Sequence, residues 1–291
     1  MVTVRAPATS ANLGSGFDVF GLALARPADV VRVERAETTS IEITGVGSRY
    51  IPTDPADNTA GAVADALDAP ARIEIDKGVR PSSGLGSSAA SAAATAVAID
   101  RLYDLGHDAE TLVRAAAEGE AVVSGEAHAD NVAPAILGGF TIVTAGGITA
   151  IDASLSLVAC LPETVVSTRD ARGVVPANAS MDDLVETVGA AATLTAGMAR
   201  DDPELVGRGM HDSVVTPERA ALIDGYERVG EAAREAGATG VTISGAGPAM
   251  LAVCRPGDRR SVAAAMIDAF DAVGVESRAY QTEVGQGVEI L

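Results

Sequence analysis

The chain has 291 residues, 47% of them hydrophobic, and its 40 acidic and 21 basic residues give a formal net charge of −19. This length and apolar fraction suffice for one large domain or for two ordinary ones. The acidic balance argues against nucleic acids and anionic membranes as partners, and no apolar run reaches the roughly 18 residues that would predict a membrane span.

Hydrophobic periodicity predicts a mixture of strands and helices in the first half of the chain. Strands are predicted at residues 2–5, 17–25, 30–34, 41–44 and 72–75. Helices are predicted at residues 58–67, 87–102 and 108–123. A pair of strands is then predicted in "GGFTIVTA" and "GITAIDA", residues 138–145 and 147–153.

The second half begins with two β-branched runs that predict strands at residues 155–162 and 163–169. Helices are predicted at residues 181–199, 203–209 and 217–236. The chain then predicts strands at 240–244 and 249–254, a helix at 259–273 and a strand at 276–281. This order is typical of α+β layers rather than of a doubly wound sheet. The sequence pattern changes near residues 150–160, which predicts two domains, 1–153 and 154–291.

The stretch "PSSGLGSSAASAAATAVAID", residues 81–100, puts flexible glycines directly before a strong helix former. Gly84 and Gly86 can adopt backbone angles barred to other residues, and the following helix offers unpaired N–H groups and the positive end of its dipole. Loop and helix together therefore predict an anion site suited to phosphates. A simple capped helix is the alternative. A dinucleotide fingerprint also matches formally, but the helical pattern continues to Asp100 where that motif needs a second strand.

Cysteine and lysine usage adds two expectations. Cys160 and Cys254 lie in no metal-like spacing, so we expect two buried thiols in a reducing compartment. The N-terminal segment also lacks the pattern of a signal peptide, which favours a cytoplasmic protein. Lys77 is the sole lysine, and it heads no Walker A motif. An acidic surface nearly free of lysine predicts a halophilic protein, with an acidic protein of ordinary salt as the alternative.

Three segments in order resemble the three motifs of the GHMP kinases over essentially the whole chain. The first motif is "RAPATSANLGSGFDVFGLAL" (residues 5–24), the second is "RPSSGLGSSAAS" (80–91) and the third is "GVTISGAGPAMLAV" (240–253). Within the family, the first motif is similar to the branch that acts on L-homoserine. So are "GEAHADNVAPAILGG", "ARGVVP" and "TPERAALIDGY", which begin at residues 125, 171 and 216.

The resemblance implies an α+β GHMP kinase fold. Its N-terminal domain would resemble domain 2 of ribosomal protein S5, and its C-terminal domain would be a ferredoxin-like α/β sandwich. It further implies transfer of the γ-phosphate of ATP, with Mg²⁺, to the side-chain hydroxyl of L-homoserine, a step toward threonine. The nucleotide would lie between the domains, and a homodimer is expected.

The family motifs also imply which residues bind the nucleotide and the metal. The expected nucleotide-binding residues are Asn58, Pro81, Ser82, Ser83, Gly84, Leu85, Gly86, Ser87, Ser88, Ala89 and Ala90. Ser88 and Glu120 are the expected metal ligands, because Mg²⁺ takes oxygen ligands and keeps several waters. A solvated carboxylate is the alternative for Glu120. The glycines Gly245 and Gly247 are expected to let the third motif close tightly behind the loop.

The acceptor would be an amino acid with an alcohol group, which needs three kinds of partner. Arginines match a carboxylate with two prongs, and the motifs supply Arg172 and Arg219. Asn12 and Asp18 are expected to accept from the ammonium group. The remaining expected acceptor-binding residues are Asn131 and His128.

For catalysis, we expect Asn131 to aim the hydroxyl and Glu120 to hold the metal, with Asp130 as the reserve candidate for a base. Loose phosphoryl transfer needs alignment and charge neutralisation more than a strong base. Thr9 stands where mevalonate-type kinases have a lysine, which argues against mevalonate as the acceptor. The alternatives are another small-molecule kinase of the family, of mevalonate or shikimate type, and a non-catalytic nucleotide-binding regulator. Ser15, Arg80 and Asp224 depart from the family pattern without removing an expected ligand.

Overall fold

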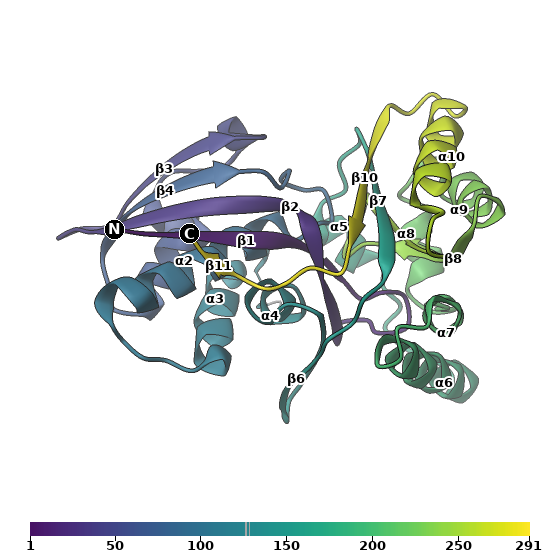
Figure 1. Ribbon diagram of the computed structural model, residues 1–291, viewed down its shortest axis with the longest axis horizontal. Helices are drawn as coiled ribbons and strands as arrows, with labels where there is room; N and C mark the ends of the chain where they lie inside the picture. The colour runs from purple at the N-terminus through teal and green to yellow at the C-terminus, as the bar shows by residue number, and fades with distance from the viewer. Residues whose placement is uncertain (126, 128) are drawn as a thin grey trace.

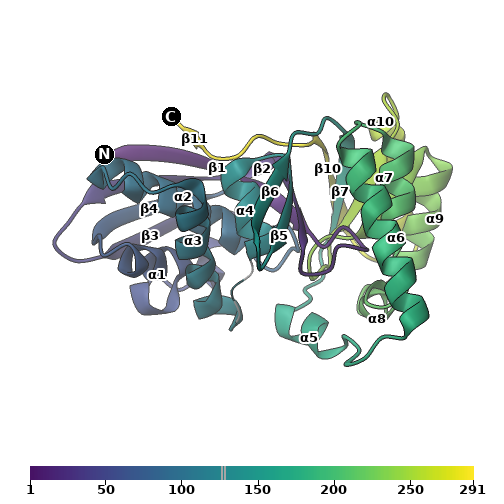
Figure 2. The same cartoon turned by 90° about the horizontal axis from the view of Figure 1, so that it is seen from below.

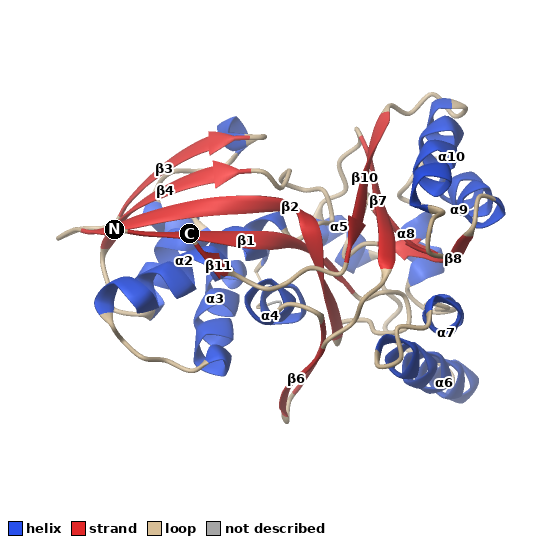
Figure 3. Cartoon of the chain, viewed as in Figure 1, coloured by secondary structure: helices blue, strands red, loops and turns tan. Residues whose placement is uncertain are grey.

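In the part of the chain that the structure describes, two β-sheets lie side by side along the long axis, each with helices packed against it (Figures 1 and 3). The structure is a computed structural model, and it describes residues 1–125, 127 and 129–291. None of the described helices is long and apolar enough to cross a membrane. Cys160 and Cys254 are free and buried, as expected.

The first sheet has the strand order β11-β1-β2-β4-β3, with β5 on β2 and β6 on β5. Its strands are β1 (Val2–Ala11), β2 (Phe20–Arg35), β3 (Ser40–Gly45), β4 (Ala71–Lys77), β5 (Phe140–Thr144), β6 (Gly147–Ile151) and β11 (Glu289–Ile290). β3 and β4 are parallel, and the other neighbours are antiparallel. Its helices are α1 (Thr59–Ala66), α2 (Ser87–Tyr103), α3 (Ala109–Ser124) and α4 (Ala129–Leu137). Two short 3₁₀ turns, Ser48–Tyr50 and Pro55–Asp57, precede α1.

The second sheet is antiparallel and has the strand order β10-β7-β9-β8. Its strands are β7 (Ser156–Pro162), β8 (Ala238–Ile243), β9 (Met250–Cys254) and β10 (Ser277–Glu283). Its helices are α5 (Thr168–Gly173), α6 (Met181–Met198), α7 (Pro203–Gly209), α8 (Thr216–Ala220), α9 (Tyr226–Glu235) and α10 (Arg259–Asp271). Strand, helices, two strands, helix and strand follow one another, which is the β-α-β-β-α-β order of the expected ferredoxin-like sandwich.

We call the first sheet with its helices the first unit, and the second sheet with its helices the second unit. The alanine-rich helix α2 is the central helix of the first unit. Most of its residues are buried, and it packs against β1, β2, α1, α3 and α4 (Figure 2). A helix that is apolar on nearly all sides belongs in a core, and alanine side chains let its neighbours approach closely. This packing fixes the first turn of α2, and with it the loop that precedes it.

The structure corrects several predicted elements. Residues 17–19 lie in a loop, and β2 is continuous from Phe20 to Arg35 where two strands were predicted. Residues 163–167 are irregular and α5 begins at Thr168, because the Ser167 side chain accepts a hydrogen bond from the N–H of Asp170 and starts a helix. The helix predicted over 217–236 is broken into α8 and α9 before Gly225, whose φ is +84°. Helix α4 and the short β11 were not predicted.

The surface charge gives a prediction about salt. Like charges on a compact surface repel, and the repulsion weakens as the Debye length falls from about 10 Å at 0.1 M salt to about 3 Å at 1 M. Because the net charge is −19, the melting temperature should rise between 0.1 and 2 M KCl. Thermal melts across that range test this, and a melting temperature that is flat or falls with KCl would contradict it.

Candidate active site

The loop of residues 81–86, called here the nucleotide loop, is built so that only glycine fits at two of its positions. Gly84 and Gly86 have φ values of +78° and +62°. A Cβ atom on Gly84 would lie 2.4 Å from the carbonyl oxygen of Ser244, and one on Gly86 would lie 1.9 Å from Thr9 Oγ1. Gly86 is also the N-cap of α2, which begins without a side-chain cap. The glycines therefore let the first and third motifs pack tightly around the start of the helix.

The third motif supports the nucleotide loop from behind, as expected from its glycines. Ser244 Oγ donates to the carbonyl oxygen of Gly84 at 2.7 Å, and the N–H of Ala249 donates to that of Ser83 at 3.1 Å. The first motif contributes the N–H of Thr9, which donates to the carbonyl oxygen of Leu85 at 3.1 Å. The loop is thus held by segments more than 150 residues apart in sequence.

A buried ion pair lies beneath the first turn of α2. Lys77 and Asp29 are 3% and 0% exposed and form a salt bridge. Lys77 Nζ also donates to the carbonyl oxygen of Ser87 at 2.7 Å and to Ser91 Oγ at 2.8 Å. Burial lowers the pKa of Lys77, and the Asp29 carboxylate opposes that shift. Sequence analysis did not predict this role, although the survival of a single lysine in so acidic a chain was a signal for it.

The expected metal ligands meet where α2 and α3 pack together. Ser88 Oγ donates to Glu120 Oε2 at 2.8 Å. The pKa of Glu120 is raised to about 7, chiefly by burial, against which the hydrogen bond from Ser88 and the charge of Lys77 act; nearby Asp130 contributes to the rise. Glu120 is therefore a buried carboxyl on the border of ionisation, beside a hydroxyl.

This donor set fits Mg²⁺. In nucleotide-dependent enzymes Mg²⁺ is commonly held by one or two protein oxygens, with phosphates and waters as the other ligands. Among the described residues there is no group of three or more His, Cys, Asp or Glu side chains that could hold a metal. The described residues therefore do not form a metal site made of protein ligands alone. Ser88 and Glu120 match a site in which the nucleotide phosphates and waters supply the other ligands.

Asn131 lies at the other side of the nucleotide loop, at the start of α4. Its Oδ1 accepts a hydrogen bond from Thr9 Oγ1 at 2.9 Å and would lie 3.1 Å from a Cβ atom on Gly86. Its Nδ2 donates to Asp130 Oδ1 at 3.4 Å. Thr9, which replaces the lysine of mevalonate-type kinases, thus fixes which way the amide of Asn131 points. The prediction for His128 lies outside the described residues.

The two arginines expected to bind the acceptor lie together around the ring of Phe17. Arg172 forms a two-pronged ion pair with Asp18, with Nη1–Oδ2 and Nη2–Oδ1 distances of 2.6 and 3.2 Å. Arg219 is buried, and its Nε and Nη1 donate to the carbonyl oxygens of Ala171 and Gly245 at 3.1 and 3.0 Å. Burial lowers the pKa of Arg219, and Arg172 adds to that shift.

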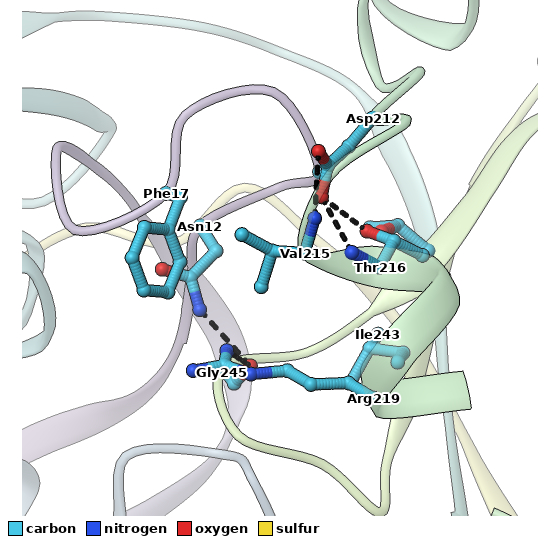
Figure 4. A pocket seen from close by; sticks show the side chains of 10 residues that line it. Asn12, Phe17, Asp212, Val215, Thr216, Arg219, Ile243 and Gly245 are labelled. Atoms are coloured by element: carbon cyan, nitrogen blue, oxygen red, sulfur yellow. Dashed lines mark hydrogen bonds between the residues drawn. The ribbon is translucent and has the colours of Figure 1, made fainter. Parts of the chain in front are cut away.

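Several predicted ligands use their side chains to hold the structure itself. Asn12 Nδ2 donates to the carbonyl oxygen of Gly245 at 2.9 Å (Figure 4), and Asn12 Oδ1 accepts from the N–H of Asp18 at 3.0 Å. Asn58 caps α1, and Ser87 Oγ donates to the carbonyl oxygen of Val79 at 2.7 Å. Binding of a ligand by these three side chains stays a prediction.

The loop between β1 and β2 carries Asn12, Phe17 and Asp18, and it is anchored on the second unit. Ser15 Oγ donates to the carbonyl oxygen of Gly209 at 2.6 Å. A Cβ atom on Gly14 would lie 1.9 Å from the carbonyl oxygen of Met210. Ser15, one of the departures from the family pattern noted above, therefore supplies a contact to the last residue of α7. The same loop contains positive φ values at Asn12, Leu13 and Asp18, a form of backbone strain that collects at functional sites.

Arg219 is brought to this loop by helix α8. In the turn that leads into this helix, Asp212 accepts hydrogen bonds from the N–H groups of Val215 and Thr216 at 3.2 and 2.7 Å (Figure 4). Arg219 and Asn12 then converge on the same carbonyl oxygen, that of Gly245. The predicted acceptor cluster therefore adjoins the third motif, which in turn contacts the nucleotide loop.

A glycine-rich loop suited to phosphates lies between two α+β units and next to a cluster of charged groups. This is the arrangement of a small-molecule kinase. Residues 56–139 match the pattern described as "GHMP kinases N terminal domain", and residues 194–272 match "GHMP kinases C terminal". The chain belongs to the GHMP kinase family.

Relatives within the family are similar over the full chain. The homoserine kinase of Natronomonas pharaonis is 70% identical over 100% of both chains. That of Halorubrum lacusprofundi is 72% identical over 100% of this chain and 99% of its own. The crystal structure of homoserine kinase from Cytophaga hutchinsonii superposes with a TM-score of 0.91 at 35% identity, covering 100% of this chain and 97% of that one. The first two relatives come from haloarchaea, which agrees with the halophilic interpretation of the acidic surface.

Proposed function

We propose that this protein transfers the γ-phosphate of ATP to the side-chain hydroxyl of L-homoserine, giving O-phospho-L-homoserine on the route to threonine. The observation that carries the proposal is the cluster of Asp18, Arg172 and Arg219 beside the third motif. The names of the full-length relatives agree with it.

The charge pattern of this cluster suits an amino acid. Asp18 and Arg172 pair with each other in the structure. An incoming zwitterion carries both complementary charges, so its carboxylate can take the arginines while its ammonium takes Asp18. Mevalonate and shikimate carry a carboxylate without an ammonium, and either would leave Asp18 without a cation once Arg172 turned to the acceptor. A zwitterion therefore keeps both charges of this partly exposed pair matched, which favours the amino acid.

The residues around the nucleotide loop would orient the reacting groups. The glycines open the loop and the first turn of α2 to the phosphates. Asn131, held by Thr9, would receive the acceptor hydroxyl and aim it at the γ-phosphate. Ser88 and Glu120 would hold Mg²⁺, which neutralises charge on the β- and γ-phosphates during transfer.

Asp130 is the reserve candidate for a general base. It lies beside Asn131, and its carboxylate is close enough to Glu120 to raise that group's pKa. Phosphoryl transfer through a loose transition state depends on alignment and charge stabilisation more than on early proton removal. We therefore infer catalysis by positioning, with Asn131 in the main role and Asp130 as the group that would finally take the proton.

We also infer that the protein works in the cytoplasm as a homodimer, as the resemblance to the family implies. Helix α6 offers one surface for such contact. Met181, Leu184, Val185 and Val188 are 71%, 51%, 69% and 60% exposed, at the spacing of one helical face.

The test of the proposed function is an acceptor panel with ATP and Mg²⁺ in concentrated KCl. We expect L-homoserine to be phosphorylated far faster than mevalonate, shikimate, galactose or L-serine, and ATP to be turned over only when an acceptor is present. L-Serine is the matched control, because it is the same zwitterion with one methylene fewer. Equal or faster turnover of any rival would overturn the assignment, and no turnover with any acceptor would favour the non-catalytic regulator.

A further inference from the structure

We propose that Phe17 is a positioning residue that sets specificity for the acceptor's carboxylate by holding Arg172 and Arg219 side by side against its ring. This inference rests on the proposed function, because it names the residue that organises the carboxylate end of the same site. Phe17 lies in the loop between β1 and β2 and was not among the predicted ligands.

The contacts of the ring carry the inference. The guanidinium carbon of Arg172 lies 5.2 Å from the centroid of the Phe17 ring, and that of Arg219 lies 5.0 Å from it. The face of an aromatic ring is negative and attracts a cation at such distances. The two guanidiniums repel each other, since Arg172 lowers the pKa of Arg219. A shared ring attracts both cations and so opposes this repulsion.

The two arginines are held to different degrees. Arg219 is 6% exposed and fixed by two carbonyl oxygens. The side chain of Arg172 is 32% exposed, and it extends from α5, which has six residues. Its ion-pair partner Asp18 is also the group proposed to take the ammonium of the acceptor. When Asp18 turns to the ammonium, the contact with Phe17 still restrains Arg172, because it does not use the carboxylate.

The ring itself is well placed for this role. Phe17 lies beside Asn12 at the wall of a small cavity that Arg219 also lines (Figure 4). The backbone on either side is fixed by Ser15, which donates to Gly209, and by Asp18, whose N–H donates to Asn12. A ring on an anchored loop can set the spacing of two flexible side chains, whereas a mobile ring could not.

The experiment separates the carboxylate from the rest of the acceptor. Two inhibitors are used, L-2-aminobutyrate, which keeps the carboxylate and lacks the hydroxyl, and 3-aminopropan-1-ol, which keeps the hydroxyl and lacks the carboxylate. In Phe17→Leu we expect the inhibition constant of L-2-aminobutyrate and the KM of L-homoserine to rise about tenfold, an effect between those of an exposed and of a desolvated cation–π contact. The constant of 3-aminopropan-1-ol and the KM of ATP should stay within about twofold.

Matched variants complete the test. Phe17→Tyr keeps the ring face and should remain within about twofold of the wild type, while Phe17→Met, which fills similar space without a ring, should behave like Phe17→Leu. Arg219→Lys keeps the charge but loses the fork, so it should also weaken L-2-aminobutyrate selectively. Equal weakening of both inhibitors would show a merely structural role, and no weakening would show that the ring does not act; either overturns the inference. If the wild type does not phosphorylate L-homoserine, the proposed function fails instead.

Discussion

Replacing Glu120 with glutamine should lower kcat by about two orders of magnitude or more, because a proposed metal ligand and its negative charge are lost from a buried site. Glutamine keeps the size of the side chain and can still accept a hydrogen bond from Ser88 Oγ, which lies 2.8 Å from Glu120 Oε2. The fold should therefore survive. The rate is measured over a range of Mg²⁺ concentrations, with circular dichroism to check the fold.

The matched control is Glu118→Gln, two residues earlier on the same helix. Glu118 is exposed whereas Glu120 is 5% exposed, so the same change of charge is made with and without burial. Glu118→Gln should stay within about twofold of the wild type, as surface changes usually do. Activity of Glu120→Gln within a few-fold of the wild type at limiting Mg²⁺ would remove Glu120 from the metal site.

The raised pKa of Glu120 adds a dependence on pH. The carboxyl binds a metal only when it is deprotonated, so protons and Mg²⁺ compete for it. With a pKa of about 7, activity at limiting Mg²⁺ should rise with pH through neutrality, and this rise should move to lower pH as Mg²⁺ is increased. Glu120→Gln should lack that dependence on Mg²⁺.

Stability should respond in the opposite direction. The folded carboxyl has a pKa of about 7, above its ordinary value of 4.5, so between these two values the folded state holds a proton that the unfolded chain has lost. Without metal, the free energy of unfolding should therefore fall as pH rises through this window. Glu120→Gln should remove this contribution, and denaturant unfolding at a series of pH values would measure it.

The parts of the site that the sequence could predict depend on short-range features. Gly84 and Gly86 precede an alanine-rich helix within one continuous stretch, so their role in a tight anion loop follows from backbone freedom and helix polarity. Ser88 and Glu120 lie on two consecutive predicted helices, and a pair of adjacent helices can bring them together. The tight packing at the two glycines and the contact of Ser88 with Glu120 are observed, and binding of an anion or a metal there stays a prediction.

The parts that could not be predicted depend on long-range contacts. Asn12 donates to the carbonyl oxygen of Gly245, 233 residues away, and this contact determines that its amide holds the loop. Arg219 likewise donates to the carbonyl oxygens of Ala171 and Gly245, which lie 48 and 26 residues away in the sequence. Nothing local to residue 17 indicates that its ring will meet two arginines from the second unit.

The prediction of secondary structure failed where one local signal competed with another or with burial. Residues 163–169 are rich in β-branched side chains, but Ser167 caps the helix α5 and the cap decides the outcome. No element was predicted at residues 129–137, yet α4 forms there with Pro134 inside it, and tertiary packing buries its apolar residues. Local propensity is a weak guide when burial favours the other structure.

Replacing Lys77 with methionine should lower the free energy of unfolding by about 3–5 kcal/mol, the usual result of breaking a buried ion pair by removing one partner. Methionine fills most of the space of the lysine stem but leaves Asp29, which is 0% exposed, without its cation. The hydrogen bonds from Nζ to the carbonyl oxygen of Ser87 and to Ser91 Oγ are lost as well. Urea denaturation in concentrated KCl measures the effect.

Arg32→Met is the matched control, because Arg32 pairs with Glu74 on the surface of the same sheet, with side chains 51% and 35% exposed. Surface ion pairs contribute about 0–1 kcal/mol, and concentrated salt screens them further. Combining Lys77→Met with Asp29→Leu should return part of the lost stability, since neither member of the pair is then left as a buried charge without its partner. A loss for Lys77→Met no larger than that for Arg32→Met would show that the pair beneath α2 contributes little. A large loss that the double variant partly restores would identify the single lysine of the chain as a support of the start of α2, because Nζ binds the carbonyl oxygen of Ser87 in the first turn of that helix.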